Sequence, residues 1–248
     1  MRKLAKLTWV EFKLLFREPV VVFFTLAFPV MMLFLFGAIY GNRPSPLFGG
    51  LGTIDISVPA YMCMIIATAG LISLPVTVSS YRENGVLRRL SATPVGTTAI
   101  LTAQVVVNLG ITLVGAALLV TSARLAYHVR FSGSAASIVL ALVFASLSFL
   151  SLGFMLTGFT STSRAALAVS MAVMYPMLFL SGASIPREML PSGVKRFGEF
   201  LPLTHVVTLM RGLWVGDSWG AHLKEVWVLA AVLVVSVAVS ARTFRYES

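Results

Sequence analysis

Charged residues are scarce in this chain and unevenly spread. Only 11% of the 248 residues are Asp, Glu, Lys or Arg, and six long stretches contain none of them. These stretches lie between Glu18 and Arg43, Asp55 and Arg82, Arg89 and Arg124, Arg130 and Arg164, Arg164 and Arg187, and Glu225 and Arg242. A soluble protein needs a polar surface, which a chain with 58% hydrophobic residues cannot supply. The scarcity of charge therefore excludes a soluble globular domain and indicates a polytopic membrane protein.

Cysteine and catalytic motifs are also scarce or missing. Cys63 is the only cysteine, which excludes an internal disulfide and a thiolate metal cluster. The sequence contains no Gly-x-x-x-x-Gly-Lys-Ser/Thr phosphate loop, no Gly-x-Ser-x-Gly and no His-Glu-x-x-His. The three histidines, His128, His205 and His222, are scattered, so an intramembrane enzyme would lack a nucleophile–base pair. We therefore predict no catalytic site, no metal site and no cofactor bound by the chain itself.

The uncharged stretches have the length of membrane-spanning helices. A bilayer core of roughly 30 Å needs about 20 apolar residues in a helix. Five stretches reach this length, and the sixth reaches it if its helix begins near Trp219 or His222. The predicted fold is an all-α polytopic membrane protein with six transmembrane helices, at about 19–40, 58–80, 97–123, 135–159, 165–185 and from 219 or 222 to 241. None has an ionisable residue in its interior, which disfavours a carrier driven by protons or sodium.

The positive charges at the ends of these stretches predict the orientation. A net charge of +10 would favour nucleic acid as the partner of a soluble protein, but here the cations are topology signals. The loops on the side of both termini have more Lys and Arg per residue, so we expect both termini in the cytoplasm. We expect residues 1–248 to form a single transmembrane domain in the plasma (inner) membrane of a bacterium. It would contact the lipid bilayer and no nucleic acid.

The first 18 residues have an amphipathic pattern. On a helix, Arg2, Lys6, Lys13 and Arg17 form one basic stripe, which predicts an interfacial helix over residues 1–18 at the cytoplasmic surface. Glu11 and Glu18 lie opposite this stripe, and we interpret them as facing a protein partner or an internal cation. The alternative is a charged flank that only anchors the first span.

Two further segments outside the spans have helical patterns. Residues 186–223 predict a hairpin of two short helices on the outer side, re-entrant or interfacial, with Thr204 capping the second helix and Gly216 ending it. Residues 81–95 predict a short cytoplasmic helix that presents charge to a partner. In that loop Val86, Leu87 and Leu90 form an apolar set beside a charged set. A generic positively charged turn would explain the arginines of this loop but not its leucines and its glutamate.

With these motifs the chain resembles the membrane subunit of type-2 ABC exporters, in particular the daunorubicin-resistance-like permeases. The first motif follows the second span and comprises Glu83, Gly85, Leu87, Leu90, Thr93 and Pro94. The second precedes the last span and comprises Pro186, Pro191, Phe200-Leu-Pro-Leu-Thr-His205 and Arg211. The resemblance implies two permease chains, identical or paralogous, on two copies of a separate ABC ATPase subunit that binds ATP and Mg.

The resemblance also implies which residues couple the permease to the ATPase. The interfacial helix and the loop after the second span would dock on the ATPase. The coupling residues would be Glu11, Arg82, Glu83, Gly85, Leu87, Arg88, Leu90, Thr93 and Pro94. Glu83 would carry the coupling by accepting hydrogen bonds or a cation from the ATPase.

A translocation path lined by the second and fifth spans is the last implication of the resemblance. We select Ser73 and Thr77 of the second span and Met171, Met174, Tyr175 and Phe179 of the fifth, because methionine and aromatic side chains adapt to varied apolar cargo. Helix packing alone is the competing explanation for each of them. The expected function is export of small apolar or amphipathic compounds, drug-like or lipid-like. The alternatives are polysaccharide or glycolipid export within the family, and a passive channel or membrane scaffold without an ATPase outside it.

Overall fold

The computed structural model describes residues 2–92 and 96–243, and every regular element within them is a helix. Six helices are long and apolar enough to cross a membrane, which confirms the predicted fold class. Among the described residues they are, in chain order, η1 with α3 (Phe23–Ala27, Phe28–Tyr40), α4 with η3 and α5 (Thr53–Thr68, Ala69–Ser73, Leu74–Glu83), α7 (Gly96–Tyr127), α8 (Ala135–Thr157), α9 (Ser163–Leu180), and η5 with α12 (Trp219–His222, Leu223–Thr243). The short helix α2 (Pro19–Val22) directly precedes the first of them.

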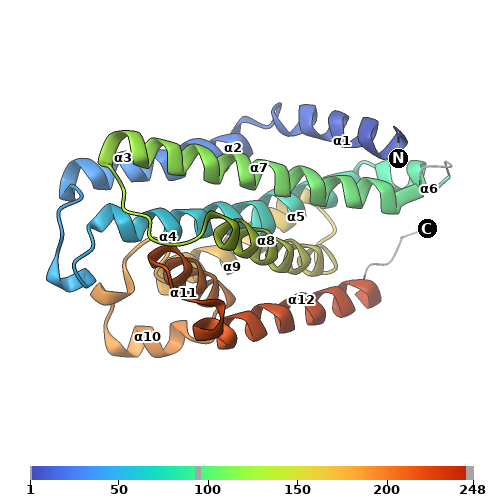
Figure 1. The fold of residues 1–248 in the computed structure, drawn as a ribbon. Coiled ribbons are helices and arrows are strands. Elements are labelled where there is room, and N and C mark those ends of the chain that lie inside the picture. Colours follow the sequence, from blue (N-terminus) through green and yellow to red (C-terminus); the bar gives the residue numbers. More distant parts are fainter. Residues whose placement is uncertain (1, 93–95, 244–248) are drawn as a thin grey trace.

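The molecule has two ends, which Figure 1 shows at the right and at the left. We call the right-hand end the terminal end, because it carries the N-terminus, the C-terminal end of α12 and the short helix α6 (Val86–Ser91). We call the left-hand end the loop end, which carries the loops 41–52 and 128–134 and the short helix α10 (Ser192–Gly198). The turn 158–162 between α8 and α9 lies toward the terminal end.

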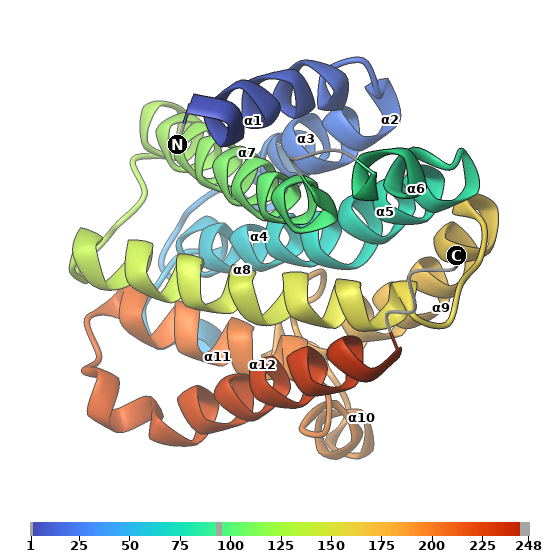
Figure 2. The same ribbon diagram turned by 90° about the vertical axis from the view of Figure 1, so that its right-hand side faces the viewer.

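Helix α4 lies at the centre of the bundle, and α12 lies at its edge. Nearly every residue of α4 is buried, because α3, α7, α8, α9 and α11 (Pro202–Val215) all pack against it. In α12 only Leu229 and Ser236 are buried, and Figure 2 shows this helix on the outside beside α8 and α11. The apolar exposed surface of α12 is what a lipid-facing helix requires.

The first two spans each contain a wide helical turn before a proline. The amide of Phe28 donates to the carbonyl of Phe23, and the amide of Leu74 donates to the carbonyl of Ala69, which is a spacing of five residues instead of four. Pro29 and Pro75 follow directly. Proline has no amide hydrogen and its ring clashes with the carbonyl four residues earlier, so a wider turn relieves the clash. The first span thus accommodates Pro29 after a π-helical turn.

Two glycines allow η3 and α8 to cross at very short distance. A Cβ atom at Gly153 would lie 2.0 Å from the carbonyl oxygen of Gly70, and one at Gly70 would lie 2.7 Å from Phe149. Small residues permit such close approach between membrane helices, where van der Waals contact replaces the hydrophobic effect as the driving force. The second span, which contains η3, therefore packs against α8 in close contact at this crossing.

Replacing Gly153 with alanine is expected to lower the stability of the protein by about 1–3 kcal/mol, because the new methyl group must displace backbone. Gly110→Ala in α7 is the matched control, since a Cβ there meets nothing within 4 Å. The measurement is the thermal unfolding midpoint in detergent. Equal midpoints for both variants would contradict the close crossing.

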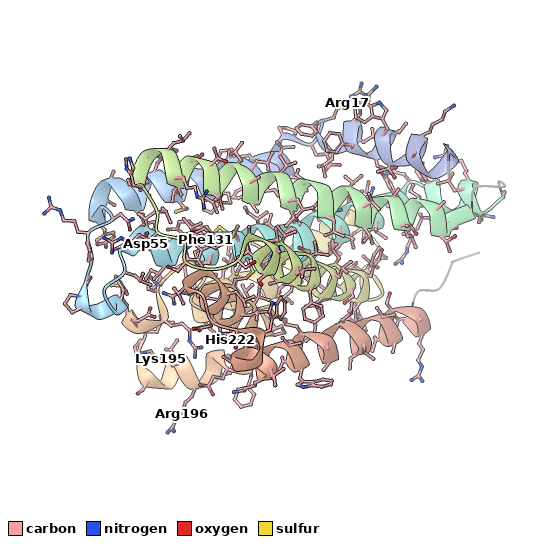
Figure 3. All side chains as sticks on the ribbon, viewed as in Figure 1. Arg17, Asp55, Phe131, Lys195, Arg196 and His222 are labelled. Carbon is pink, nitrogen blue, oxygen red and sulfur yellow. The ribbon has the colours of Figure 1, made fainter. Side chains whose placement is uncertain are left out.

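At the loop end, a buried carboxylate holds two loops together. Asp55 is 1% exposed, and it accepts hydrogen bonds from the amide nitrogens of Gly52 (2.9 Å) and Arg130 (2.9 Å) and from the side-chain amide of Asn42 (2.9 Å). Gly52 precedes α4, so this carboxylate also caps the helix. Figure 3 shows Asp55 close to the loop end. Sequence reasoning treated it only as the boundary of an uncharged stretch.

The segment before the last span folds into the two expected short helices, α10 and α11. Gly216 ends α11 in the left-handed conformation, with φ of 106°, as predicted. The capping role predicted for Thr204 is wrong. Helix α11 begins at Pro202, and the Thr204 hydroxyl donates to the carbonyl of Gly198, which ties α11 to α10. Most of α11 is buried, so this helix is part of the bundle, whereas its position relative to a bilayer stays a prediction.

Candidate functional site

The loop after the second span forms the short helix that its pattern predicts. Gly85 turns the chain between α5 and α6 with φ of +66°, a conformation that favours glycine. Leu87 is buried, Val86 and Leu90 are half-buried, and Arg88 and Arg89 are exposed. The predicted coupling residues Thr93 and Pro94 lie outside the residues that the structure describes. Helix α6 thus presents two arginines at the terminal end.

Arg82 and Glu83, the last residues of α5, hold the turn between α8 and α9. The Arg82 guanidinium donates to the carbonyls of Thr157 (2.8 Å) and Thr160 (3.0 Å) at the end of α8. The Glu83 carboxylate accepts from the backbone amide (2.9 Å) and the hydroxyl (2.8 Å) of Ser163, the first residue of α9. We call these five residues and their contacts the Arg82–Glu83 clasp.

The charges of the clasp match the ends of the helices that they contact. The last carbonyls of a helix are unpaired and carry partial negative charge, and the first amides are unpaired and carry partial positive charge. Arg82 therefore complements the end of α8, and Glu83 complements the start of α9. Since both side chains come from adjacent residues, the end of α5 is bound to the end of α8 and to the start of α9 at one point.

This geometry changes the interpretation of Glu83. We predicted that Glu83 accepts hydrogen bonds or a cation from a partner subunit, but its Oε2 atom is already bound to Ser163. The exposed side chains of α6 are those of Arg88, Arg89 and Ser91, and the Arg89 guanidinium also donates to the carbonyl of Asn84 (3.0 Å). Glu83 thus contacts α9 of its own chain, and its role toward an ATPase stays a prediction.

Glu11 lies in a buried polar cluster one residue away from the clasp. It is 4% exposed, and its Oε2 atom accepts hydrogen bonds from the Tyr81 hydroxyl and from the Gln104 side-chain amide (2.5 Å). The cluster ties α1 (Arg2–Leu15) to α5 and α7. Burial raises the pKa of the Glu11 carboxyl above its ordinary value, although the two hydrogen bonds act in the opposite direction.

The hydrogen bonds of Glu11 lie within its own chain. Its partners among the described residues are the neutral groups of Tyr81 and Gln104. The Asn108 side chain extends the cluster by donating to the Gln104 carbonyl (2.9 Å). Glu11 therefore fixes the position of α1, and its role toward an ATPase stays a prediction.

An apolar groove lies between the first, second and fifth spans. It encloses a cavity of about 130 Å³. Its lining is Val21, Phe24, Phe28, Met64, Thr68, Ile72, Leu167, Met171, Met174, Tyr175 and Leu178. The groove thus brings together three of the predicted path residues, Met171, Met174 and Tyr175. Phe179 is 53% exposed one turn further along α9 and does not line it.

Ser73 and Thr77, the path residues predicted in the second span, do not line this groove. Ser73 is 1% exposed and its hydroxyl has no hydrogen-bond partner among the described residues, and Thr77 is half-buried. Met64, Thr68 and Ile72 take their place. Ser73 is the last residue of the π-helical turn Ala69–Ser73, and the groove-lining residues of this span, Met64, Thr68 and Ile72, come before it.

Metal binding has no support in the geometry. Within residues 2–92 and 96–243, no group of three or more His, Cys, Asp or Glu side chains is placed to hold a metal ion. The Arg82–Glu83 clasp can hold the end of α8 and the start of α9, and the apolar groove can enclose an apolar molecule.

Comparison with known proteins gives one family match and several relatives. The model of the family described as ABC-2 type transporter matches residues 2–214. The "ABC transporter G family member 20" of Dictyostelium discoideum is 30% identical over 79% of this chain and 26% of its own length. The "Probable multidrug ABC transporter permease YbhR" of Escherichia coli K12 is 26% identical over 68% of this chain and 45% of its own length. The "Nodulation protein J" of Rhizobium leguminosarum bv. viciae is 37% identical over 29% of this chain and 28% of its own length. The chain thus spans less than half of the length of each of these relatives.

Proposed function

Because the chain belongs to the ABC-2 type transporter family, we propose that it is the permease subunit of an ATP-driven exporter. It moves apolar or amphipathic compounds, drug-like or lipid-like, out of the cytoplasm, and a separate ABC ATPase subunit supplies the energy. ATP and Mg bind to two copies of that ATPase. A second permease chain, identical or paralogous, completes the membrane part.

The Arg82–Glu83 clasp is the observation that carries this proposal. An ATPase that pushes on α6 displaces the end of α5, because only Asn84 and Gly85 separate the two helices. The clasp then passes the displacement to the end of α8 and the start of α9. Since α9 forms one wall of the apolar groove, the same displacement changes the shape of the groove. A membrane scaffold or passive channel would not need such a connection.

The apolar groove supports the proposed cargo class. Its lining is almost entirely apolar, and it contains methionines and an aromatic side chain that can adapt to different molecules. Its cavity of about 130 Å³ is smaller than a typical ligand pocket of about 300–1,000 Å³. The groove must therefore widen when cargo enters, as an ATP-driven change of shape allows. The name of the Escherichia coli relative, a multidrug permease, agrees with this cargo class.

The proposed orientation places the terminal end in the cytoplasm and the loop end outside, in the plasma (inner) membrane of a bacterium. The exposed cations of the terminal end, among them Lys6, Lys13, Arg88 and Arg89, support it through the positive-inside rule. In this orientation α6 meets a cytoplasmic ATPase.

Transport by inside-out membrane vesicles tests the proposed function. Vesicles that contain the chain and its ATPase should accumulate an amphipathic fluorescent dye when ATP is added, and they should not accumulate it with a non-hydrolysable ATP analogue. Equal dye flux with and without ATP would favour a passive channel.

Tyr175→Ala is expected to change cargo preference, because it removes the largest polar-tipped side chain from the groove. We expect the ratio of transport rates for two dyes of different size to shift by about 5-fold, the effect of about 1 kcal/mol of lost contact. Val169→Ala is the matched control, since Val169 lies on the same helix, is 37% exposed and does not line the groove. An unchanged ratio for Tyr175→Ala would leave only a packing role for this residue.

A further inference from the structure

A second and larger pocket opens at the loop end, far from the clasp. It encloses about 610 Å³ between the segments 48–59 and 187–195 and helix α11. Phe48, Leu51, Pro59, Val207 and Trp214 form its apolar lining. Nothing in the proposed transport mechanism uses this pocket, so its chemistry needs a separate explanation.

Three cations line the pocket. They are Arg187, Lys195 and Arg211, and the acidic residues that line it are Asp55 and Glu188. Asp55 is 1% exposed, and its two oxygens already accept three hydrogen bonds within the loop end. Only Glu188 remains to balance three positive charges from inside the pocket.

The hydrogen bonds and ion pairs of Arg187 and Arg211 are long. Arg211 lies 3.3 Å from one oxygen of Glu188 and 3.4 Å and 3.5 Å from the other, and Arg187 lies 3.9 Å from Glu199 and 3.5 Å from the Thr208 hydroxyl. Charge-assisted hydrogen bonds are usually about 2.7–2.9 Å long. Both guanidinium groups are also mostly buried, with exposed side-chain fractions of 25% for Arg187 and 16% for Arg211. An incoming anion can therefore form better hydrogen bonds than those present.

Lys195 is the cation with the greatest freedom. Its side chain is half-buried, and its ammonium group has no hydrogen-bond or ion-pair partner among the described residues. Figure 3 shows Lys195 on α10 together with its neighbour Arg196, whose side chain points away from the body of the molecule. Arg196 is exposed and does not line the pocket. The two adjacent cations thus differ in whether they face the pocket.

We propose that this pocket binds the anionic head group of an amphiphile, a phosphate or a carboxylate, through Arg187, Lys195 and Arg211. The alkyl part of the amphiphile lies against Phe48, Leu51 and Trp214. Guanidinium groups bind such planar or tetrahedral anions in a bidentate manner, and the apolar lining accepts a chain that an inorganic ion does not have. The amphiphile comes either from the anionic phospholipid of the bilayer or from a free compound, and both have the same head-group chemistry.

Binding of dodecyl phosphate tests the site in the full chain, without an ATPase. The protein is placed in nanodiscs of zwitterionic phosphatidylcholine, and dodecyl phosphate is titrated by calorimetry. We expect binding that inorganic phosphate does not match and that dodecyltrimethylammonium does not reproduce. Lys195→Gln should weaken it by about tenfold, the usual effect of one charge-assisted hydrogen bond. Arg196→Gln should leave it unchanged.

A second variant keeps the test decisive. Arg211→Gln should also weaken binding about tenfold or more, and if this variant does not fold, Lys195→Gln and Arg196→Gln still decide. Equal affinity for the phosphate and the ammonium amphiphile, or equal affinity of the Lys195 and Arg196 variants, would overturn the site. Nanodiscs that contain phosphatidylglycerol assign the source. Loss of dodecyl phosphate binding in them supports a bilayer lipid as the ligand, and unchanged binding supports a free amphiphile.

Discussion

Glu83→Ala is expected to lower ATP-driven transport and cargo-stimulated ATP hydrolysis at least tenfold, within the range of about 5–150-fold that is typical of coupling between sites. The substitution removes both hydrogen bonds that join the end of α5 to Ser163. The start of α9 then no longer follows α5, so movement of α6 does not reach the groove. Glu83 is exposed, and we expect the variant to fold and to insert into the membrane as the parent chain does.

Ser163→Ala distinguishes whether Glu83 acts through its hydrogen bonds to α9 or through direct contact with the ATPase. If Glu83 acts through α9, this variant should lose part of the transport, because the backbone amide of residue 163 still donates to the carboxylate. The double variant Glu83→Ala with Ser163→Ala should then be no worse than Glu83→Ala alone. If Glu83 instead contacts the ATPase directly, Ser163→Ala should have full activity.

Asn84→Ala is the matched control for the clasp. Asn84 is the exposed neighbour of Glu83, and its side chain bonds only to Ser80 within the same helix. We expect transport and ATP hydrolysis by this variant at the level of the parent chain. Full transport by Glu83→Ala would show that the clasp does not couple α5 to α9.

Glu11→Ala is expected to give the largest loss of stability. The substitution removes the carboxylate acceptor of the half-buried Tyr81 hydroxyl and of the buried Gln104 amide, and the Gln104 amide then keeps only its long hydrogen bond to the Tyr81 oxygen (3.4 Å). Each unpaired buried group costs about 1–3 kcal/mol, so we expect the free energy of unfolding to fall by about 2–5 kcal/mol. The thermal midpoint in detergent measures this loss. Glu18→Ala is the matched control, because Glu18 is exposed, and its midpoint should not change.

The pH dependence of stability provides a second measurement on Glu11. Burial raises the pKa of Glu11 above 4.5, its ordinary value, so the folded chain favours the neutral carboxyl. A group with a raised pKa contributes stability below its ordinary pKa, and this contribution is lost as the pH rises through the pKa of the folded state. We expect the thermal midpoint to fall as the pH rises above 4.5, and Glu11→Gln to reduce that slope. Identical slopes for the parent chain and Glu11→Gln would contradict the assignment.

The membrane spans could be predicted from the sequence because bilayer thickness sets them. An uncharged stretch of sufficient length is a local property, and so is the pattern of leucine and arginine that predicts α6. The ends of the second span differ from the prediction. The helix begins at Thr53 and ends at Glu83, since Asp55 and Glu83 find partners inside the protein and do not have to leave the helix.

The partners of the site residues could not be predicted in the same way. Ser163 lies 80 residues from Glu83, and Gln104 lies 93 residues from Glu11, so only the packing of α5 against α9 and of α1 against α7 brings them together. The resemblance named Ser73 as a path residue, and the π-helical turn that contains it leaves no clear signal beyond the following proline.

The most direct test of the account is to purify the tagged chain from native membranes in mild detergent and to identify its partners by mass spectrometry. The account predicts recovery of an ABC ATPase in about equal amounts with the chain. The Glu83→Ala variant should recover the same ATPase, because the clasp passes on the displacement of α5 only after the ATPase has bound to α6. Recovery of the chain without an ATPase, together with solute flux in ATP-free liposomes, would contradict an ATP-driven permease and support a passive channel.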